Sequence, residues 1–344
     1  MFRRPLSIAL LLGAAACSVQ QLRPPQASDD HMSHMSAADL RAPVVQAGSV
    51  ARQGTPGIPA SNNTAPARLA ASPRHGEWVK FALTPGSKDS IMAWVVFPQS
   101  RAKAPVVVVV HEIFGLSTWV RGVADQVAAD GFIAVAPDFL SLVRPGGPST
   151  TELPGTEATA LIRGPTVTTT FINQVITGAA NYGMMLPAAE QRYAVIGYCW
   201  GGSASWDQAI NGGVKGFAGA VPFYGTPYTS GGGRATATTP ATPTTVNIDS
   251  LKKINVPVML LSGSNDTRIT ALMPQIDSAM KALGKNYSGT NYPGASHGFL
   301  RQQDDPHTGR DGSPDTATQA ADIAAAKDAW PKTIAFLKKN LGVK

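Results

Sequence analysis

The five consecutive valines of "APVVVVVHEI", Val106–Val110, constrain the fold more than any other feature of this sequence. The run is long enough for one strand, and it has no polar residue on either of its alternating sides. Such strands are typical of parallel sheets whose two faces are both covered by helices. The run therefore predicts a central strand of an α/β protein.

Strand-like and helix-like segments alternate along the rest of the chain. The N-terminal "EWVKFAL" predicts an edge strand, and Pro331 predicts a break or a cap inside the last helix. We expect one domain over residues 76–344, with a mostly parallel sheet and helices on both of its faces. Other segments on which this expectation rests are the strand-like "FIAVAPDF", "YAVIGYC" and "VPVMLLSGSND" and the helix-like "STWVRGVADQVAADG" and "AADIAAAKDAWPKTIAFLKKNL".

The first 17 residues, "MFRRPLSIALLLGAAAC", have the pattern of a secretory signal peptide. Two arginines precede an apolar run that is too short to span a bilayer. Cys17 follows three alanines and resembles the cysteine of a bacterial lipobox, although Ala14 stands where leucine is usual. We expect export to the periplasm of a bacterium. Lipid attachment through Cys17, simple cleavage and a twin-arginine route all remain open.

Residues 18–75 are expected to form a disordered tether, because Gln20 to Pro73 contain no aromatic residue and are rich in proline, alanine and polar residues. Of the formal net charge of +7, residues 1–75 contribute +4, and we find no basic run interleaved with aromatics. A nucleic-acid partner is therefore not expected. The Gly/Thr/Pro-rich residues 226–249 predict a mobile insertion. "HMSHM" at residues 31–35 is a weak metal pattern, and we expect no metal and no cofactor.

Cys199 and Cys17 are the only cysteines, so Cys199 has no intrachain partner once Cys17 is removed or lipidated. A lone cysteine is commonly a small buried hydrophobic residue. Here, however, it lies in "GYCWGG" between a predicted strand and a predicted helix. This is the nucleophile elbow of α/β-hydrolases, in which the helix N-terminus stabilises a thiolate. The backbone N–H of Trp200 then points toward the oxyanion that forms during acyl transfer.

An elbow of this kind requires an acid and then a histidine later in the chain, each after a strand. Asp266 in "GSND" and His297 in "ASHGF" meet the requirement. Singly, the aspartate could cap a helix and the histidine could lie on a surface loop. Together with Cys199, in this order and at strand ends, they predict a catalytic triad in which His297 is the base and Asp266 orients it.

Several motifs in order, among them "VVVVVHEIFGL", "GYCWGG", "FYG", "GSND" and "ASHGF", resemble the dienelactone hydrolase family (carboxymethylenebutenolidases) of α/β-hydrolases. The resemblance covers about residues 77–341 and implies a Cys-Asp-His triad. It further implies that Glu112, in "HEIFG", pairs with the cysteine thiol at rest and moves away when substrate binds. A solvated loop acid is the alternative for Glu112, and the five preceding valines argue against it.

The resemblance also implies an oxyanion hole made by the amides of Ile113 and Trp200. Arg301, four residues after the histidine, matches the position of a family arginine that binds the substrate carboxylate; otherwise it is a surface charge. Further anchoring side chains after "APDF" cannot be aligned, and Arg144 and Arg163 stay open. The export signal, the tether and the insertion also depart from the compact cytosolic enzyme of the family, so dienelactone itself is not predicted as the substrate.

We therefore expect an exported α/β-hydrolase that cleaves a small ester or lactone through an acyl-thioenzyme, without a cofactor. The expected partner is a small-molecule substrate, and membrane attachment is expected only through a lipidated Cys17. Two alternatives remain. One is a thioesterase, acyltransferase or polyester-active enzyme on the same scaffold, and the other is a non-catalytic tethered binding protein.

Overall fold

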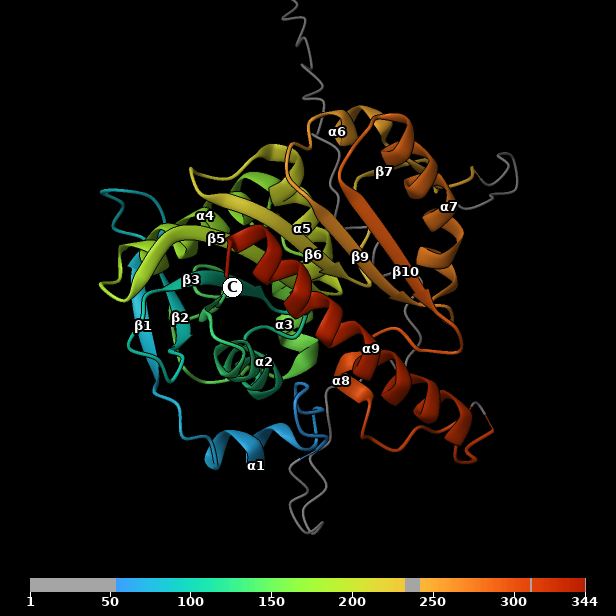
Figure 1. Ribbon diagram of the computed structural model, residues 1–344, viewed down its shortest axis with the longest axis horizontal. Helices are drawn as coiled ribbons and strands as arrows, with labels where there is room; N and C mark the ends of the chain where they lie inside the picture. The colour runs from blue at the N-terminus through green and yellow to red at the C-terminus, as the bar shows by residue number, and fades with distance from the viewer. Residues whose placement is uncertain (1–53, 233–241, 310, 344) are drawn as a thin grey trace, which may run out of the picture.

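The computed structural model describes residues 54–232, 242–309 and 311–343 (Figure 1). An eight-stranded sheet has the order β1-β2-β4-β3-β5-β6-β9-β10. Its strands are β1 (Gly76–Ala82), β2 (Ser90–Val96), β3 (Ala104–Val110), β4 (Ile133–Pro137), β5 (Ala189–Tyr198), β6 (Phe217–Phe223), β9 (Val258–Gly263) and β10 (Tyr287–Tyr292). The helices are α1 (Ala65–Ala70), α2 (Thr118–Ala129), α3 (Gly155–Ile162), α4 (Thr169–Met185), α5 (Trp200–Asn211), α6 (Ile248–Lys252), α7 (Thr267–Ala282), α8 (Phe299–Gln302) and α9 (Thr316–Leu341).

The sheet is mostly parallel, as the sequence predicts. Strand β2 is antiparallel to both of its neighbours, β1 and β4, while all pairings from β4 to β10 are parallel. The predicted edge strand is β1, which pairs with β2 alone in this sheet. The predicted fold class, an α/β-hydrolase fold with a mostly parallel sheet between helices, is confirmed.

The five valines lie in β3, whose residues are all buried. Val107 and Val109 belong to a core cluster that includes residues of α2 and α9, and Figure 1 shows α9 crossing this face of the sheet. Val106, Val108 and Val110 belong to a second cluster with residues of α4. Alternate side chains of one strand therefore pack against helices on opposite faces, which is why the run contains no polar residue.

Residues 54–75 correct the predicted tether, because the structure packs them against the domain. Ile58, Ser61 and Ala65 are buried, and the Trp119 indole of α2 donates a hydrogen bond of 3.0 Å to the carbonyl of Ala60. Hydrogen bonds and small buried side chains replace the large apolar residues that this segment lacks. The signal segment with Cys17, the histidines at 31 and 34, and the rest of the predicted tether lie outside the described residues.

Two further expectations are modified by the structure. Helix α9 continues through Pro331 and neither breaks nor caps there. A proline inside a helix costs about 3 kcal/mol, and the burial of Trp330, Leu337 and Leu341 offsets this cost. In the predicted insertion, β7 (Thr229–Ser230) and β8 (Thr245–Val246) form an antiparallel two-stranded ribbon. Residues 233–241 between them lie outside the described residues.

Candidate active site

Cys199 lies at the turn between β5 and α5 in a strained backbone conformation. Its φ of 55° and ψ of −114° are rare for a residue with a side chain, and such strain is typical of functional sites. The turn requires its two flanking glycines. A Cβ on Gly197 would lie 2.0 Å from the carbonyl oxygen of Gly201, and one on Gly201 would lie 2.4 Å from the carbonyl oxygen of His111. The local sequence therefore places a buried, free cysteine at the N-terminus of a helix.

Asp266 and His297 form a buried pair after β9 and β10. Nδ1 of His297 lies 2.5 Å from Oδ2 of Asp266. The other carboxylate oxygen caps helix α7 by accepting a hydrogen bond from the N–H of Ile269. Burial by itself would raise the pKa of Asp266, but His297, Arg268 and the Ile269 amide together lower it to about 2. Asp266 is therefore an ionised acceptor that fixes the imidazole ring.

Cys199 is the third member of this cluster. Burial by itself would lower the pKa of His297, but the charges of Cys199 and Asp266 outweigh burial and hold this pKa well above its usual value. Nε2 of His297 is buried and has no partner of good hydrogen-bond geometry among the described residues. A side-chain interaction with Cys199 also raises the pKa of His297, so the ring and the sulfur lie close together. The structure brings together the three residues of the predicted triad.

Glu112 and Arg301 form an ion pair that was not predicted from the sequence. Nε of Arg301 lies 2.8 Å from Oε2 of Glu112, and both side chains are buried. The guanidinium also lies over the Phe114 ring, 5.5 Å from its centroid. Burial by itself would lower the pKa of Arg301, but Glu112 and other nearby groups raise it. Glu112 and Arg301 are thus not the solvated loop acid and surface charge considered as alternatives.

The amides predicted for the oxyanion hole follow neighbouring strands. Val110 of β3 is paired with Gly197 of β5 in a parallel register. Ile113 and Trp200 each lie three residues beyond these partners, so both follow the carboxyl edge of the sheet at the same offset. The near-contact of Gly201 with the end of β3 keeps the first turn of α5 against this loop.

His111 supports the Glu112 loop from inside the protein. Its Nδ1 lies 2.5 Å from the carbonyl oxygen of Glu112, and its Nε2 accepts a hydrogen bond of 3.1 Å from the N–H of Phe139. Burial lowers the pKa of His111 to about 4, which agrees with a neutral ring that donates at one nitrogen and accepts at the other. The sequence left open whether Arg144 anchors the substrate. In the structure it is buried and forms an ion pair with Asp138, with 3.3 Å between nitrogen and oxygen.

Sequence reasoning gave no role to two tyrosines that border the cluster. The hydroxyls of Tyr198 and Tyr224 are buried and have no hydrogen-bond partner among the described residues. Burial and the charge of Glu112 raise both pKa values well above the usual range. The Tyr224 ring lies 5.1 Å from the His297 ring. The motif "FYG" at the end of a strand was the available signal for Tyr224.

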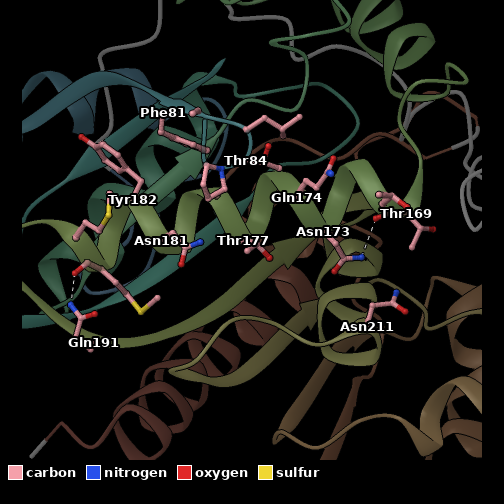
Figure 2. Close-up of a pocket in the computed structure, with 17 residues that line it drawn as sticks. Phe81, Thr84, Thr169, Asn173, Gln174, Thr177, Asn181, Tyr182, Gln191 and Asn211 are labelled. Atoms are coloured by element: carbon pink, nitrogen blue, oxygen red, sulfur yellow. Dashed lines mark hydrogen bonds between the residues drawn. The ribbon is translucent and has the colours of Figure 1, made fainter. Parts of the chain in front are cut away.

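A cavity on another part of the domain is lined by none of these residues. It has a volume of about 840 Å³ and runs along α4 beneath the end of β1 (Figure 2). Asn173, Thr177 and Asn181 lie along one side of the helix, and Phe81 and Tyr182 stack with their ring centroids 5.7 Å apart. None of the proposed catalytic residues lines this groove.

Comparison with known proteins decides the family. The pattern of the Dienelactone hydrolase family matches residues 91–341. The chain belongs to this family. Relatives named "Putative carboxymethylenebutenolidase" are found in Synechocystis sp., 28% identical over 75% of this chain and 95% of the relative, and in Escherichia coli K12, 25% identical over 77% and 88%.

Solved structures agree with the hydrolase fold. The dienelactone hydrolase-like promiscuous phosphotriesterase P91 from metagenomic libraries is 18% identical and has a TM-score of 0.53, covering 75% of this chain and 98% of that one. A dienelactone hydrolase from Anabaena variabilis is 15% identical with a TM-score of 0.50, covering 78% and 98%. The chain is thus a hydrolase of the dienelactone hydrolase type, consistent with carboxylic ester chemistry on a small molecule.

The part of the chain that the structure describes contains neither a metal-binding cluster nor a membrane-spanning helix. There, no three or more His, Cys, Asp or Glu side chains are grouped so that they could hold a metal ion. Over the same residues, no helix has both the length and the apolar character needed to cross a membrane.

Proposed function

We propose that this family member cleaves a small carboxylic ester or lactone through Cys199, His297 and Asp266. The observation that carries the proposal is the convergence of a cysteine on a strained elbow with a buried histidine–aspartate pair. This arrangement is that of nucleophile, base and orienting acid. The raised pKa of His297 supports a protonated imidazolium beside the Cys199 sulfur at rest.

The reaction proceeds in two halves. The Cys199 sulfur attacks the ester carbonyl, and the resulting oxyanion accepts hydrogen bonds from the amides of Ile113 and Trp200. As the carbon–oxygen bond to the leaving group breaks, His297 gives its proton to the departing alkoxide and an acyl-thioenzyme remains. His297 then removes a proton from water, hydroxide adds to the thioester, and collapse releases the acid and the Cys199 sulfur.

Glu112 and Arg301 provide selectivity in this proposal. Some substrates carry a free carboxylate in addition to the ester that reacts. This carboxylate would compete with Glu112 for the Arg301 guanidinium, which binds carboxylates strongly. Glu112 would then be displaced from the Arg301 guanidinium. A carboxylate-bearing ester or lactone is therefore the preferred substrate class.

The location in the cell is a separate part of the proposal. Arg3, Arg4 and the apolar run before Cys17 support export to the periplasm of a bacterium, with Cys17 as a candidate for lipid attachment. Expression of the full chain in a bacterium followed by cell fractionation and mass analysis of the N-terminus tests both. Recovery of an unprocessed chain in the cytoplasm would contradict export.

Hydrolysis of p-nitrophenyl acetate by the purified protein and by Cys199→Ala tests the catalytic proposal. We expect the variant to lose activity by about a thousandfold or more, because it lacks the nucleophile. Cys199→Ser is the matched variant with a hydroxyl in the same place. Circular dichroism establishes that each variant is folded. Full activity of a folded Cys199→Ala protein would refute the proposal.

A further inference from the structure

Residues 58–64 form a segment that precedes the part of the chain matched by the family pattern, residues 91–341. The segment has no regular secondary structure, yet most of its residues are buried. Ser61 is 0% exposed and Asn62 is 9% exposed, although both are polar. Buried polar groups are expensive unless they are hydrogen-bonded, so the partners of this segment indicate what it does.

These partners lie around Arg301. The N–H of Asn62 donates a hydrogen bond of 2.8 Å to the carbonyl of Arg301. The side-chain amide of Gln303 donates one of 2.7 Å to the carbonyl of Pro59. The hydroxyl of Ser61 donates one of 2.9 Å to Asp305. The segment thus binds Arg301 itself and residues two and four positions beyond it.

The opposite side of the segment is anchored independently. The Trp119 indole of α2 donates to the carbonyl of Ala60, and the Arg68 guanidinium donates to the carbonyls of Ile58 and Thr55. Helix α2 packs on the central sheet, so it gives the segment a rigid support. The segment therefore connects this support to α8, the short helix that contains Arg301, and to the residues that follow it.

Helix α8, which contains Arg301, needs such a connection. It has four residues and follows Gly298, whose φ is 83°. A helix this short is not stable by itself, so its orientation depends on what holds it. Arg301 is buried, and its guanidinium must be aimed correctly to meet a carboxylate.

We propose that residues 58–64 are a positioning segment for Arg301, and that Ser61 is its key side chain through Asp305. The segment fixes α8 and thereby aims the guanidinium at Glu112 and at the carboxylate of the substrate. This inference rests on the proposed function of Arg301. It adds a specificity-determining element that lies outside the matched family region.

Ser61→Ala tests the proposal with two esters of the same acyl group, one carrying a free carboxylate and one neutral. We expect KM for the carboxylate ester to rise about fivefold, which corresponds to the net contribution of one ordinary hydrogen bond. The kcat for both esters and KM for the neutral ester stay unchanged. An equal change for both esters, or no change, would overturn the proposal.

Ser72→Ala is the matched control. Ser72 also follows the predicted signal segment and also donates to a carboxylate of the domain, at 2.6 Å from Asp125, but this contact is on α2 and not near Arg301. We expect no selectivity change in this variant. If Ser72→Ala reproduced the effect of Ser61→Ala, general loosening of the N-terminal part would explain it and the positioning role would be wrong.

A second readout does not depend on activity. The ¹⁵N-labelled protein should show an Arg301 Nε–H resonance, identified by its loss in Arg301→Lys. We expect this resonance to shift or broaden in Ser61→Ala and to stay in place in Ser72→Ala. If Arg301→Ala left KM for the carboxylate ester unchanged, the proposed function of Arg301 would fail, while the resonance would still decide whether the segment positions it. An unmoved resonance in Ser61→Ala would overturn the inference.

Discussion

Two regions of the molecule differ in the ionisable side chains that they contain. One is the active-site edge, the carboxyl edge of the sheet where the proposed catalytic residues lie, and the other is the groove along α4. The groove has a volume of about 840 Å³, and tyrosine is the sole ionisable residue type in its lining. The active-site edge, by contrast, gathers Cys199, Asp266, His297, Glu112 and Arg301 in buried positions. Ionisable groups are costly to bury, so a protein that retains such a cluster uses it.

The convergence of titratable side chains, and not the presence of a cavity, is therefore the basis on which we propose the catalytic site. Burial shifts the pKa of an isolated group so that its charged form is disfavoured. A nearby group of opposite charge can reverse this shift. At the active-site edge the pKa of Asp266 is lowered and the pKa of His297 is raised, and both shifts favour the charged form of the side chain. The groove along α4 contains no such pair.

The largest effect is expected at the active-site edge from Asp266→Asn. The variant keeps the shape of the side chain but presents an amide to His297, which disturbs the tautomer and the charge of the ring. We expect kcat to fall by about 10³- to 10⁴-fold, as for other triads that lose the acid. Steady-state hydrolysis of p-nitrophenyl acetate measures this. A loss below tenfold would place Asp266 outside the catalytic unit.

A smaller effect at Asp266 is expected on the stability of the fold at acid pH. The pKa of Asp266 is about 2 in the folded protein, below the usual 3.9 of the unfolded chain, so its contribution to stability is present above about pH 4 and is lost as the pH falls toward 2. It amounts to about 2 kcal/mol. Urea unfolding between pH 5 and pH 2 should therefore show a steeper loss for the native protein than for Asp266→Asn. Parallel curves would contradict the pairing.

Arg301→Ala sharpens the comparison within the active-site edge. We expect KM for a carboxylate-bearing ester to rise about tenfold or more, since one charged hydrogen-bonding partner is lost. Neutral esters should be affected little in KM. Because the change removes a positive charge beside the buried Glu112, Arg301→Lys is the accompanying variant that keeps the charge. Equal losses for charged and neutral esters would show that Arg301 has only a structural role.

The smallest effect is expected in the groove. Asn181→Arg introduces a long charged side chain into this space. We expect hydrolysis of small esters to stay within about twofold of the native rate, because ordinary surface substitutions have small effects. A large loss of activity in a folded variant would show that the groove takes part in the reaction, and the contrast between the two regions would fail.

The sequence predicted the parts of this molecule that depend on local patterns. Five valines predicted a doubly covered strand, and the order of Cys199, Asp266 and His297 at strand ends predicted their convergence, because carboxyl ends of parallel strands meet at one edge. The ion pair of Glu112 with Arg301 could not be predicted from spacing. The two residues are far apart in the chain, and only the packed structure brings them together.

The N-terminal boundary was mispredicted for a physical reason. Composition rules infer order from large apolar residues, and residues 54–75 have few. Their order instead rests on hydrogen bonds such as those of Ser61 and Asn62 to residues near α8. The effect of Pro331 on α9 was overestimated in a similar way. The local rule that a proline ends a helix does not include the packing of Trp330 and Leu337.

Trapping of the acyl-thioenzyme decides whether Cys199 is the nucleophile. The full-length protein is mixed with p-nitrophenyl acetate, quenched with acid within milliseconds to seconds, and analysed as an intact protein and as peptides by mass spectrometry. The account predicts one acetyl group on Cys199 that forms during turnover, decays when substrate is exhausted and is absent in Cys199→Ala. Undiminished turnover with the acetyl group on another residue, or with none on Cys199 at any time, would contradict it.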